Sequence, residues 1–232
     1  MAMDSGERSE TAQSVDWRRV RVWDLPTRLF HWLTVGLVAL AWLSQRMNWM
    51  QLHVRAGETL LALVLFRLMW GCCGSETARF TRFLATPAAA WRHLRQLGRR
   101  EPDVQVGHNA AGGWMVMLLL ALLFAETLSG LYVNNDIADE GPLSEIVPAA
   151  IANMISAIHA YGWDVLAAAV VLHVCAIGLY ALLKGHNLVG PMVTGIKPLP
   201  VTSRAPRRTS LWLAVLLMGF AALVTALLAF YL

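Results

Sequence analysis

Charged residues are scarce in this 232-residue sequence: they make up 15% of the chain, whereas hydrophobic residues make up 57%. In ordinary soluble domains, roughly a quarter of all residues are charged. A deficit of this size is typical of a polytopic membrane protein, because lipid-facing helices exclude charge. One membrane domain accounts for a chain of this length, so no separate soluble module is expected.

Cysteine is also rare, and its positions exclude several kinds of site. Cys72, Cys73 and Cys175 have none of the spacings of a metal site or a disulfide framework. The sequence contains no Cys-x-x-Cys-His, so nothing in it indicates a covalently attached c-type haem. The first 16 residues are polar and lack the apolar core of a cleavable signal peptide, so we expect residues 1–16 to form a mobile tail.

Long apolar stretches are what the sequence has in abundance. A membrane-spanning helix needs about 20 such residues. Five stretches are long enough, at 27–45, 51–71, 112–133, 155–183 and 211–231. The sequence therefore predicts an all-α integral membrane protein: a four-helix transmembrane bundle within residues 17–197, then a basic linker and a fifth, C-terminal transmembrane helix within 198–232.

The charges between these stretches predict the orientation of the chain. Lys and Arg gather in the N-terminal segment, in the link between the second and third stretches, and in the link before the fifth. The 134–154 loop has no Lys or Arg but carries four acidic residues: Asp136, Asp139, Glu140 and Glu145. Because positive loops stay in the cytoplasm, we expect a multi-pass membrane protein with a cytoplasmic N-terminus. The basic surface then contacts membrane lipid, and no nucleic-acid partner is expected.

Four of the seven histidines lie inside predicted spans, where ionisable side chains are costly and usually functional. His31 lies near the cytoplasmic start of the first helix, and His53 near the outer start of the second. His159 and His173 share the fourth helix, which runs from the outside inwards. The fourteen residues between them correspond to about 21 Å, with a rotation about 40° short of full alignment. One helix thus presents two imidazoles on one face at two levels.

Each level has one partner on another helix. His31 can face His173 on the cytoplasmic side, and His53 can face His159 on the outer side. Two imidazoles from facing helices are what a six-coordinate haem requires, and bundle cores are where such cofactors are held. A single membrane histidine can also serve only as a hydrogen-bonding group, and structural zinc needs four ligands together, whereas these four are split between two levels.

Several motifs resemble one family of membrane cytochromes. Residues 23–32 (WDLPTRLFHW) resemble the first-helix motif of the bacterial cytochrome b561 and nickel-iron hydrogenase b-type cytochrome family. Residues 67–71 (RLMWG) with 78–80 (ARF) resemble the end of its second helix. Residues 107–113 (GHNAAGG) resemble its entry to the third helix, with Ala110 where proline is common. Residues 187–189 (NLV) and 192–195 (MVTG) resemble the segment that closes its core, so the likeness covers roughly residues 20–197.

The resemblance implies a four-helix bundle of the bacterial inner membrane that holds two bis-histidine haems b and exchanges electrons with quinone. The family's ligands match His31, His53, His159 and His173, in the pairs that depth predicts. The fifth helix lies beyond the family core and is assigned no chemistry. Whether the chain is an enzyme by itself stays open.

Two versions of this function compete. The chain is either the membrane subunit of an oxidoreductase, with a periplasmic redox protein or a dehydrogenase or hydrogenase subunit as partner, or a stand-alone quinone-coupled superoxide oxidase. In either version the outer pair exchanges electrons on the outer side and the cytoplasmic pair exchanges them with quinone. No catalytic side chain is assigned.

Three basic side chains are further cofactor-binding candidates. Arg67 lies fourteen residues after His53 and reaches the cytoplasmic level on nearly the same helix face, where a haem propionate is its natural anion. Snorkelling to the interface is the alternative for Arg67. Arg28, one turn before His31, can do likewise or can anchor the helix at the headgroups. His108, at the mouth of the third helix, can contact a propionate, a quinone carbonyl or solvent.

The remaining ionisable groups receive weaker assignments. Glu126, well inside the third helix, is either a proton-transfer group for quinone chemistry or a neutral acid bonded to a neighbouring helix. His93 and His186 lie in basic segments and are expected to be solvated.

A transporter whose histidines relay protons or bind ions is the rival from another class. It predicts a colourless protein with helices broken near the membrane midplane. The fourth stretch has neither an internal proline nor a central glycine cluster, so the pattern favours electron transfer.

Overall fold

The protein is described by a computed structural model that covers residues 16–96, 98–100, 102–134 and 141–230. The expected mobile tail, apart from Asp16, lies outside the described residues, as do Asp136, Asp139 and Glu140 of the acidic loop.

In the described part of the chain, five helices are long and apolar enough to cross a membrane. They are α1 (Leu25–Arg46), α2 (Met50–Cys73), α5 (Ala110–Gly130), α6 (Ala149–Leu179) with its π-helical continuation η3 (Tyr180–Lys184), and α8 (Leu211–Phe230). Each coincides with one predicted span, and the largest difference is at the start of α6, which begins at Ala149 rather than at residue 155. The prediction of a mostly helical membrane protein is confirmed.

Side-chain caps fix the start of two of these helices. Asp24 precedes α1 and accepts a hydrogen bond from the Thr27 N–H at 2.8 Å. Asn109 precedes α5 and accepts one from the Gly112 N–H at 2.7 Å. Such caps satisfy N–H groups that have no partner inside the helix.

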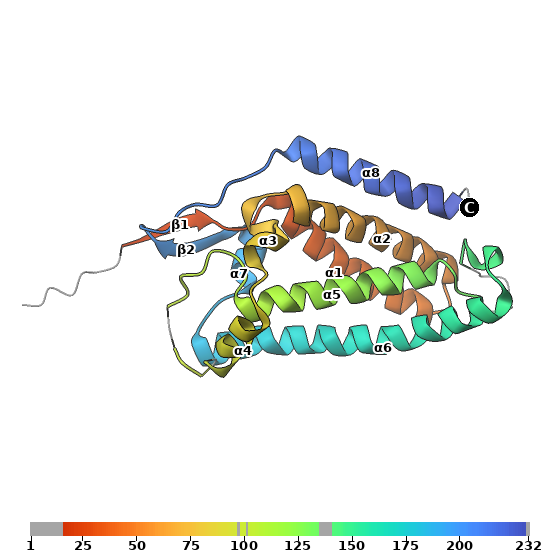
Figure 1. Ribbon diagram of the computed structural model, residues 1–232, viewed down its shortest axis with the longest axis horizontal. Helices are drawn as coiled ribbons and strands as arrows, with labels where there is room; N and C mark the ends of the chain where they lie inside the picture. The colour runs from red at the N-terminus through yellow and green to blue at the C-terminus, as the bar shows by residue number, and fades with distance from the viewer. Residues whose placement is uncertain (1–15, 97, 101, 135–140, 231–232) are drawn as a thin grey trace, which may run out of the picture.

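The long helices run side by side, with α2 at the centre (Figure 1). α1 packs on α2, α5 packs on both α2 and α6, and α8 packs on another side of α2. A continuous buried stretch of α2, residues 60–64, forms much of the core. Among the described residues, α1 and α6 make almost no close approach to each other, although both carry predicted haem ligands. The two helices are therefore held together mainly through α2 and α5.

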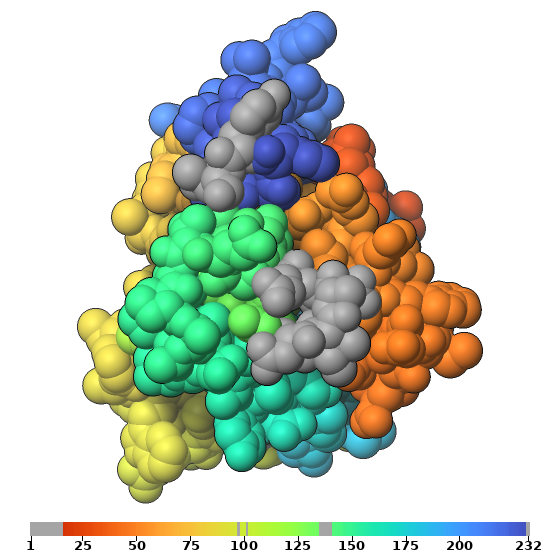
Figure 2. Space-filling view, turned by 90° about the vertical axis from the view of Figure 1, so that its right-hand side faces the viewer, coloured from red at the N-terminus to blue at the C-terminus, as the bar shows by residue number. Residues whose placement is uncertain are grey.

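A small antiparallel ribbon, which the sequence analysis did not predict, projects from one end of the bundle. It pairs β1 (Trp17–Arg21) with β2 (Ile196–Pro200), and Trp17 lies opposite Pro200. We call this the ribbon end and the opposite one the far end (Figure 1). The far end, seen face on in Figure 2, gathers the α1–α2 turn, the end of α8 and the described loop that contains η2 (Ser144–Ile146).

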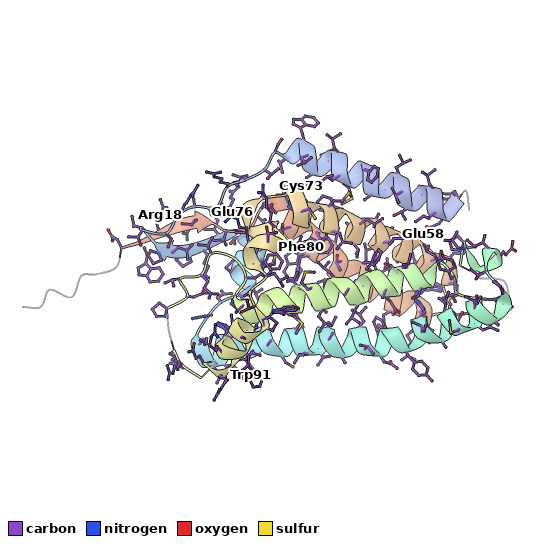
Figure 3. The ribbon with its side chains drawn as sticks, viewed as in Figure 1. Arg18, Glu58, Cys73, Glu76, Phe80 and Trp91 are labelled. Carbon is purple, nitrogen blue, oxygen red and sulfur yellow. The ribbon has the colours of Figure 1, made fainter. Side chains whose placement is uncertain are left out.

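Short helices complete the ribbon end. These are η1 (Glu76–Ala78), α3 (Phe80–Phe83), α4 (Pro87–Arg95) and α7 (Val189–Thr194). On α4, Trp91 is 65% exposed and lies at the outer margin of the molecule (Figure 3). An amphipathic helix with an exposed Trp and flanking arginines suits a membrane interface.

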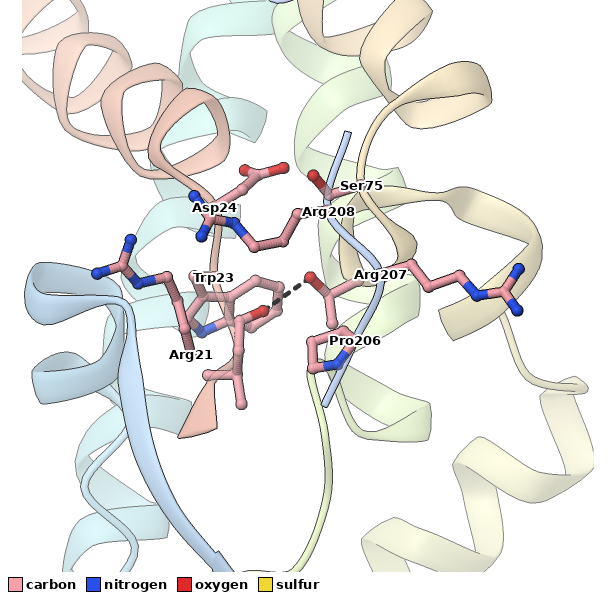
Figure 4. Close-up of a pocket in the computed structure, with 9 residues that line it drawn as sticks. Arg21, Trp23, Asp24, Ser75, Pro206, Arg207 and Arg208 are labelled. Carbon is pink, nitrogen blue, oxygen red and sulfur yellow. Dashed lines mark hydrogen bonds between the residues drawn. The ribbon is translucent and has the colours of Figure 1, made fainter. Parts of the chain in front are cut away.

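The linker before α8 is tied to the turn after α2. The Arg207 N–H donates to the Glu76 carboxylate at 2.9 Å, and the Glu76 N–H donates to the Arg207 carbonyl at 3.0 Å. The Arg207 N–H lowers the pKa of Glu76 below its usual range, and nearby arginines act in the same direction. Residues 206–208 pass over a small pocket in which Arg208 extends toward Asp24 (Figure 4). α8 is therefore fixed to the bundle by its linker as well as by its packing on α2.

Candidate functional site

Two histidines face each other at the far end. His53 on α2 and His159 on α6 have ring centroids 6.3 Å apart, with the ring planes at 85°. His53 Nδ1 lies 2.8 Å from the Ala41 carbonyl oxygen of α1, and His159 Nδ1 lies 3.0 Å from the Glu126 carbonyl oxygen of α5. Because a carbonyl oxygen only accepts, each Nδ1 carries a proton and donates it. In the neutral ring, Nε2 is then unprotonated and available to a metal.

Small neighbours make room for His159. A Cβ at Gly130 would lie 3.2 Å from His159 Cε1, and one at Gly162 would overlap the Glu126 carboxylate. The Ser129 hydroxyl lies 3.1 Å from His159 Nδ1. Glu126 Oε1 is 3.5 Å from the same nitrogen, so this carboxylate belongs to the far-end site.

The far-end pair fits a haem iron by its spacing. An iron bonded to both Nε2 atoms at about 2 Å places the two imidazole centroids roughly 6 Å apart. The observed 6.3 Å matches this value. The residues present therefore suit bis-histidine ligation at this level.

The ribbon-end level brings together His31 of α1, His173 of α6, Arg67 of α2 and His108. Burial, and then the electrostatic effects of Arg67, His173 and His31, lower the pKa of His108 to about 3. These interactions operate only over short distances, so the four side chains lie close to one another. Arg67 follows His53 by fourteen residues on α2, so it reaches the ribbon-end level, as the sequence predicted.

Several buried polar atoms at the ribbon-end level have no hydrogen-bond partner in the described part of the chain. They are His31 Nδ1, Arg67 Nη1 and His108 Nδ1. Arg67 is 2% exposed, and among the described residues no carboxylate lies within ion-pair distance of it. The Arg67 Cζ lies 5.2 Å from the centroid of the Phe80 ring, a cation–π contact that leaves Nη1 without a hydrogen-bond partner in the described chain. An anionic group such as a haem propionate would suit these donors.

His108 also borders open space. Its ring packs between Trp23 and Phe83, with centroid distances of 4.6 and 4.8 Å. It lines a cavity of about 270 Å³ that Arg82 and Arg204 also border. His108 thus lies beside this cavity and also close to His31 and His173. No local pattern in the sequence predicted the packing of the two aromatic rings on His108, although Trp23 belongs to the 23–32 motif.

Arg28 has a local partner. Its Nη1 donates to the Thr194 carbonyl at 3.2 Å, next to Gly195, whose backbone adopts a positive φ of 80°. A Cβ at Gly195 would come within 2.7 Å of Arg28 Nη1, so glycine permits this contact. Arg28 therefore joins α1 to the end of α7, and its Nε has no hydrogen-bond partner among the described residues.

His93 and His186, which we expected to be solvated, are partly exposed and also have side-chain partners. His93 Nε2 lies 2.7 Å from the Tyr180 hydroxyl, and His186 Nδ1 lies 3.9 Å from Asp103 Oδ2. Both histidines pack against the Tyr180 ring. The sequence offered no local signal for this, because the partners are far apart in the chain.

The geometry argues against the zinc alternative. In the described part of the chain, no three His, Cys, Asp or Glu side chains form a group that could hold a metal ion. The histidines instead come in pairs, and pairs suit a metal whose other ligands come from a macrocycle.

A comparison with protein families finds one match, to the model described as prokaryotic cytochrome b561, over residues 22–195. Comparisons with curated proteins and with solved structures find no match. The matched region begins at Val22, contains all four span histidines and ends before α8. The protein is therefore a membrane-embedded b-type cytochrome, and the chain belongs to the prokaryotic cytochrome b561 family.

Proposed function

We propose that the chain holds two haems b, one at each level, and passes electrons between a redox partner on the outer side of the inner membrane and the quinone pool. The observation that supports this best is the far-end pair, His53 and His159, whose Nδ1 atoms are both engaged by backbone carbonyls. His31 and His173 form the second pair, at the ribbon end. Haem b, when bound, supplies the one-electron chemistry.

The remaining residues orient the proposed ligands and balance charge. Ala41 and Glu126 hold the far-end imidazoles through their carbonyls, which leaves Nε2 of each ring for a haem iron. At the ribbon end Arg67 offers a buried positive charge, and His108 offers a neutral ring with an unpartnered nitrogen. These two side chains suit propionate carboxylates, which favour charge-assisted hydrogen bonds.

We assign the ribbon end to the cytoplasm. It carries exposed basic residues from both the N-terminal strand and the linker before α8: Arg18, Arg19, Arg21, Arg204, Arg207 and Arg208. The far end has Glu145 exposed in its described loop. The positive-inside rule then places the far end in the periplasm, where a redox protein or a dehydrogenase or hydrogenase subunit docks, while lipid surrounds the helices.

Anaerobic mixing with a short-chain quinol tests the quinone part of this proposal. The purified, haem-loaded protein should be reduced by the quinol and reoxidised by the quinone, with both changes visible in the haem absorption bands. Haem that neither quinol nor quinone affects would contradict the proposal. Rapid haem reduction by superoxide, without a protein partner, would identify the stand-alone oxidase instead.

A further inference from the structure

The cavity of about 270 Å³ beside His108 is large enough to hold a ligand. A single water molecule needs only about 15 Å³, so the cavity can take a larger group. Three segments that are far apart in the sequence form its walls: η1 with α3, the turn before α5, and the linker before α8. Glu76, one of its lining residues, lies beside the end of α2 (Figure 3).

Contacts between the three segments hold the walls of this cavity in place. The two hydrogen bonds between Glu76 and Arg207 fix the linker to η1. The Thr77 hydroxyl donates to the Val22 carbonyl at 2.7 Å, which fixes η1 to the chain just before α1. A Cβ at Gly107 would lie 3.5 Å from Thr77 Cγ2, so the turn before α5 also packs on η1. The cavity is therefore built by the fold rather than left between loose loops.

The charges that line the cavity leave it with one net positive charge. Among the described residues that border it, Arg82 and Arg204 are cations and Glu76 is the one carboxylate. The Arg207 N–H and the neighbouring arginines lower the pKa of Glu76, so this carboxylate is ionised. His108 is neutral at pH 7, because burial lowers its pKa to about 3. A ligand with a single negative charge balances this arrangement.

The two arginines at the cavity can still bind an anion. In the described part of the chain, Arg204 forms no ion pair. Arg82 Nη2 lies 3.8 Å from Glu76 Oε1, which is too long for a hydrogen bond, and the Arg82 side chain is 62% exposed. A guanidinium presents its donors in a planar fork that binds two oxygens of one phosphate group. A phosphate is therefore the anion that this pair suits best.

The position of the cavity indicates where such a phosphate comes from. α2 ends at Cys73, α5 begins at Ala110 and α8 begins at Leu211, so three membrane helices end within a few residues of the cavity. Trp114 and Trp212, near the starts of α5 and α8, are 40% and 77% exposed. Exposed tryptophans at helix ends mark the boundary between lipid and water. The cavity thus lies at the depth of the phospholipid headgroups.

We propose that the cavity binds the phosphodiester of an anionic phospholipid, with Arg82 and Arg204 as its ligands. This is one defined site, in addition to the general contact of a basic surface with lipid. A phosphodiester carries one negative charge and matches the cavity, whereas a phosphate monoester carries about 1.5 to 2. Basic pockets between membrane helices bind anionic headgroups in this way. The inference rests on the position of the ribbon end at a membrane surface and is independent of electron exchange with quinone.

Removal of each arginine tests the site. Arg82→Gln and Arg204→Gln each take one positive charge from the cavity. Arg19→Gln is the matched control, because Arg19 is exposed on β1 at the same end and does not line the cavity. The haem-loaded full chain is purified in detergent and titrated with phosphatidylglycerol or with zwitterionic phosphatidylcholine. Native mass spectrometry counts the lipids retained per chain, and inorganic phosphate serves as a soluble competitor.

The site predicts that wild type and Arg19→Gln retain one phosphatidylglycerol per chain. Arg82→Gln and Arg204→Gln should need at least about tenfold more of this lipid, since each loses a charge-assisted hydrogen bond. Phosphatidylcholine should bind all four proteins equally weakly, and haem content should not differ between them. Equal phosphatidylglycerol binding by the four proteins would overturn the site. Displacement of the lipid by an equal concentration of inorganic phosphate would overturn the lipid as its ligand and assign the site to a soluble phosphate.

Discussion

At the residue scale, the far-end histidines bond to backbone carbonyls. The carbonyls of Ala41 and Glu126 accept the Nδ1 protons, and the Glu126 carboxylate lies 3.5 Å from His159 Nδ1. At the ribbon end, His31 Nδ1 and Arg67 Nη1 have no hydrogen-bond partner among the described residues. The two levels therefore differ in how much hydrogen bonding the chain itself supplies.

Arg67→Gln should lower the midpoint potential of one haem, because a buried cation stabilises the reduced, more negative state. We expect a shift on the order of 60 mV, which is a tenfold change in equilibrium constant for a one-electron couple. A spectroscopic redox titration measures it. Arg55→Gln is the control, because Arg55 is exposed at the far end and pairs with Glu58 at 3.0 Å. Equal midpoint potentials in wild type, Arg67→Gln and Arg55→Gln would show that Arg67 does not neighbour a haem.

His108 should make stability depend on pH. Burial first, and then the charge of Arg67, hold its pKa at about 3 in the folded chain, against about 6.5 in the unfolded chain. Between these values the unfolded chain binds more protons, so stability is complete above about pH 6.5 and is lost as the pH falls. The loss is about 2 kcal/mol from pH 6.5 to pH 5. In thermal unfolding, His108→Gln should lose less stability than wild type between pH 7 and pH 5, and equal losses would contradict this assignment.

At the scale of elements, α2 carries a glycine beside one proposed ligand. Gly57 lies one turn after His53 on the same face of α2, and a Cβ built there meets nothing within 4 Å. Open space beside a proposed ligand is where a flat macrocycle can approach the helix, since protein interiors are otherwise closely packed.

Gly57→Leu should fill this space, so the protein should lose the far-end haem and keep its fold. Gly36→Leu is a matched control, since its Cβ also meets nothing within 4 Å but Gly36 lies on an exposed face of α1. Extracted haem per chain and circular dichroism check the result. Two haems in well-folded Gly57→Leu would mean that the cofactor does not occupy this face.

The sequence predicted the long helices because apolar length is a local signal, and it predicted the two-level histidine pattern because spacing along α6 is local too. The pairing of β1 with β2 joins residues about 180 positions apart, and neither strand alternates clearly enough to reveal it. The His93–Tyr180 bond is equally non-local, so the sequence did not predict the partners of His93 and His186. At Arg28, only the fold shows a Thr194 carbonyl as the partner.

At the scale of the whole molecule, charge divides the two ends. Arginines of the ribbon and of the linker before α8 cluster at one end, and α4 lies there as an amphipathic surface helix. α8, outside the family core, packs along α2 and carries no histidine. It buries part of the surface of α2 and carries none of the proposed ligands.

The proposed orientation predicts which ends a membrane-impermeant thiol reagent can reach. In a chain lacking its three cysteines, Glu145→Cys should react in intact cells, whereas Val201→Cys, at the ribbon end, should react only after the membrane is opened. Both positions are exposed. The reverse pattern would invert the topology and place the ribbon end outside.

The count of haems per chain tests the central claim most directly. A reduced-minus-oxidised spectrum of the purified protein, with haem extracted and quantified, should give two haems b per chain. The count should fall to one in His31→Ala or His53→Ala and to zero when both are changed, because each histidine serves a different level. No haem in well-folded wild-type protein, or loss of both haems in a single well-folded variant, would contradict the two-level account.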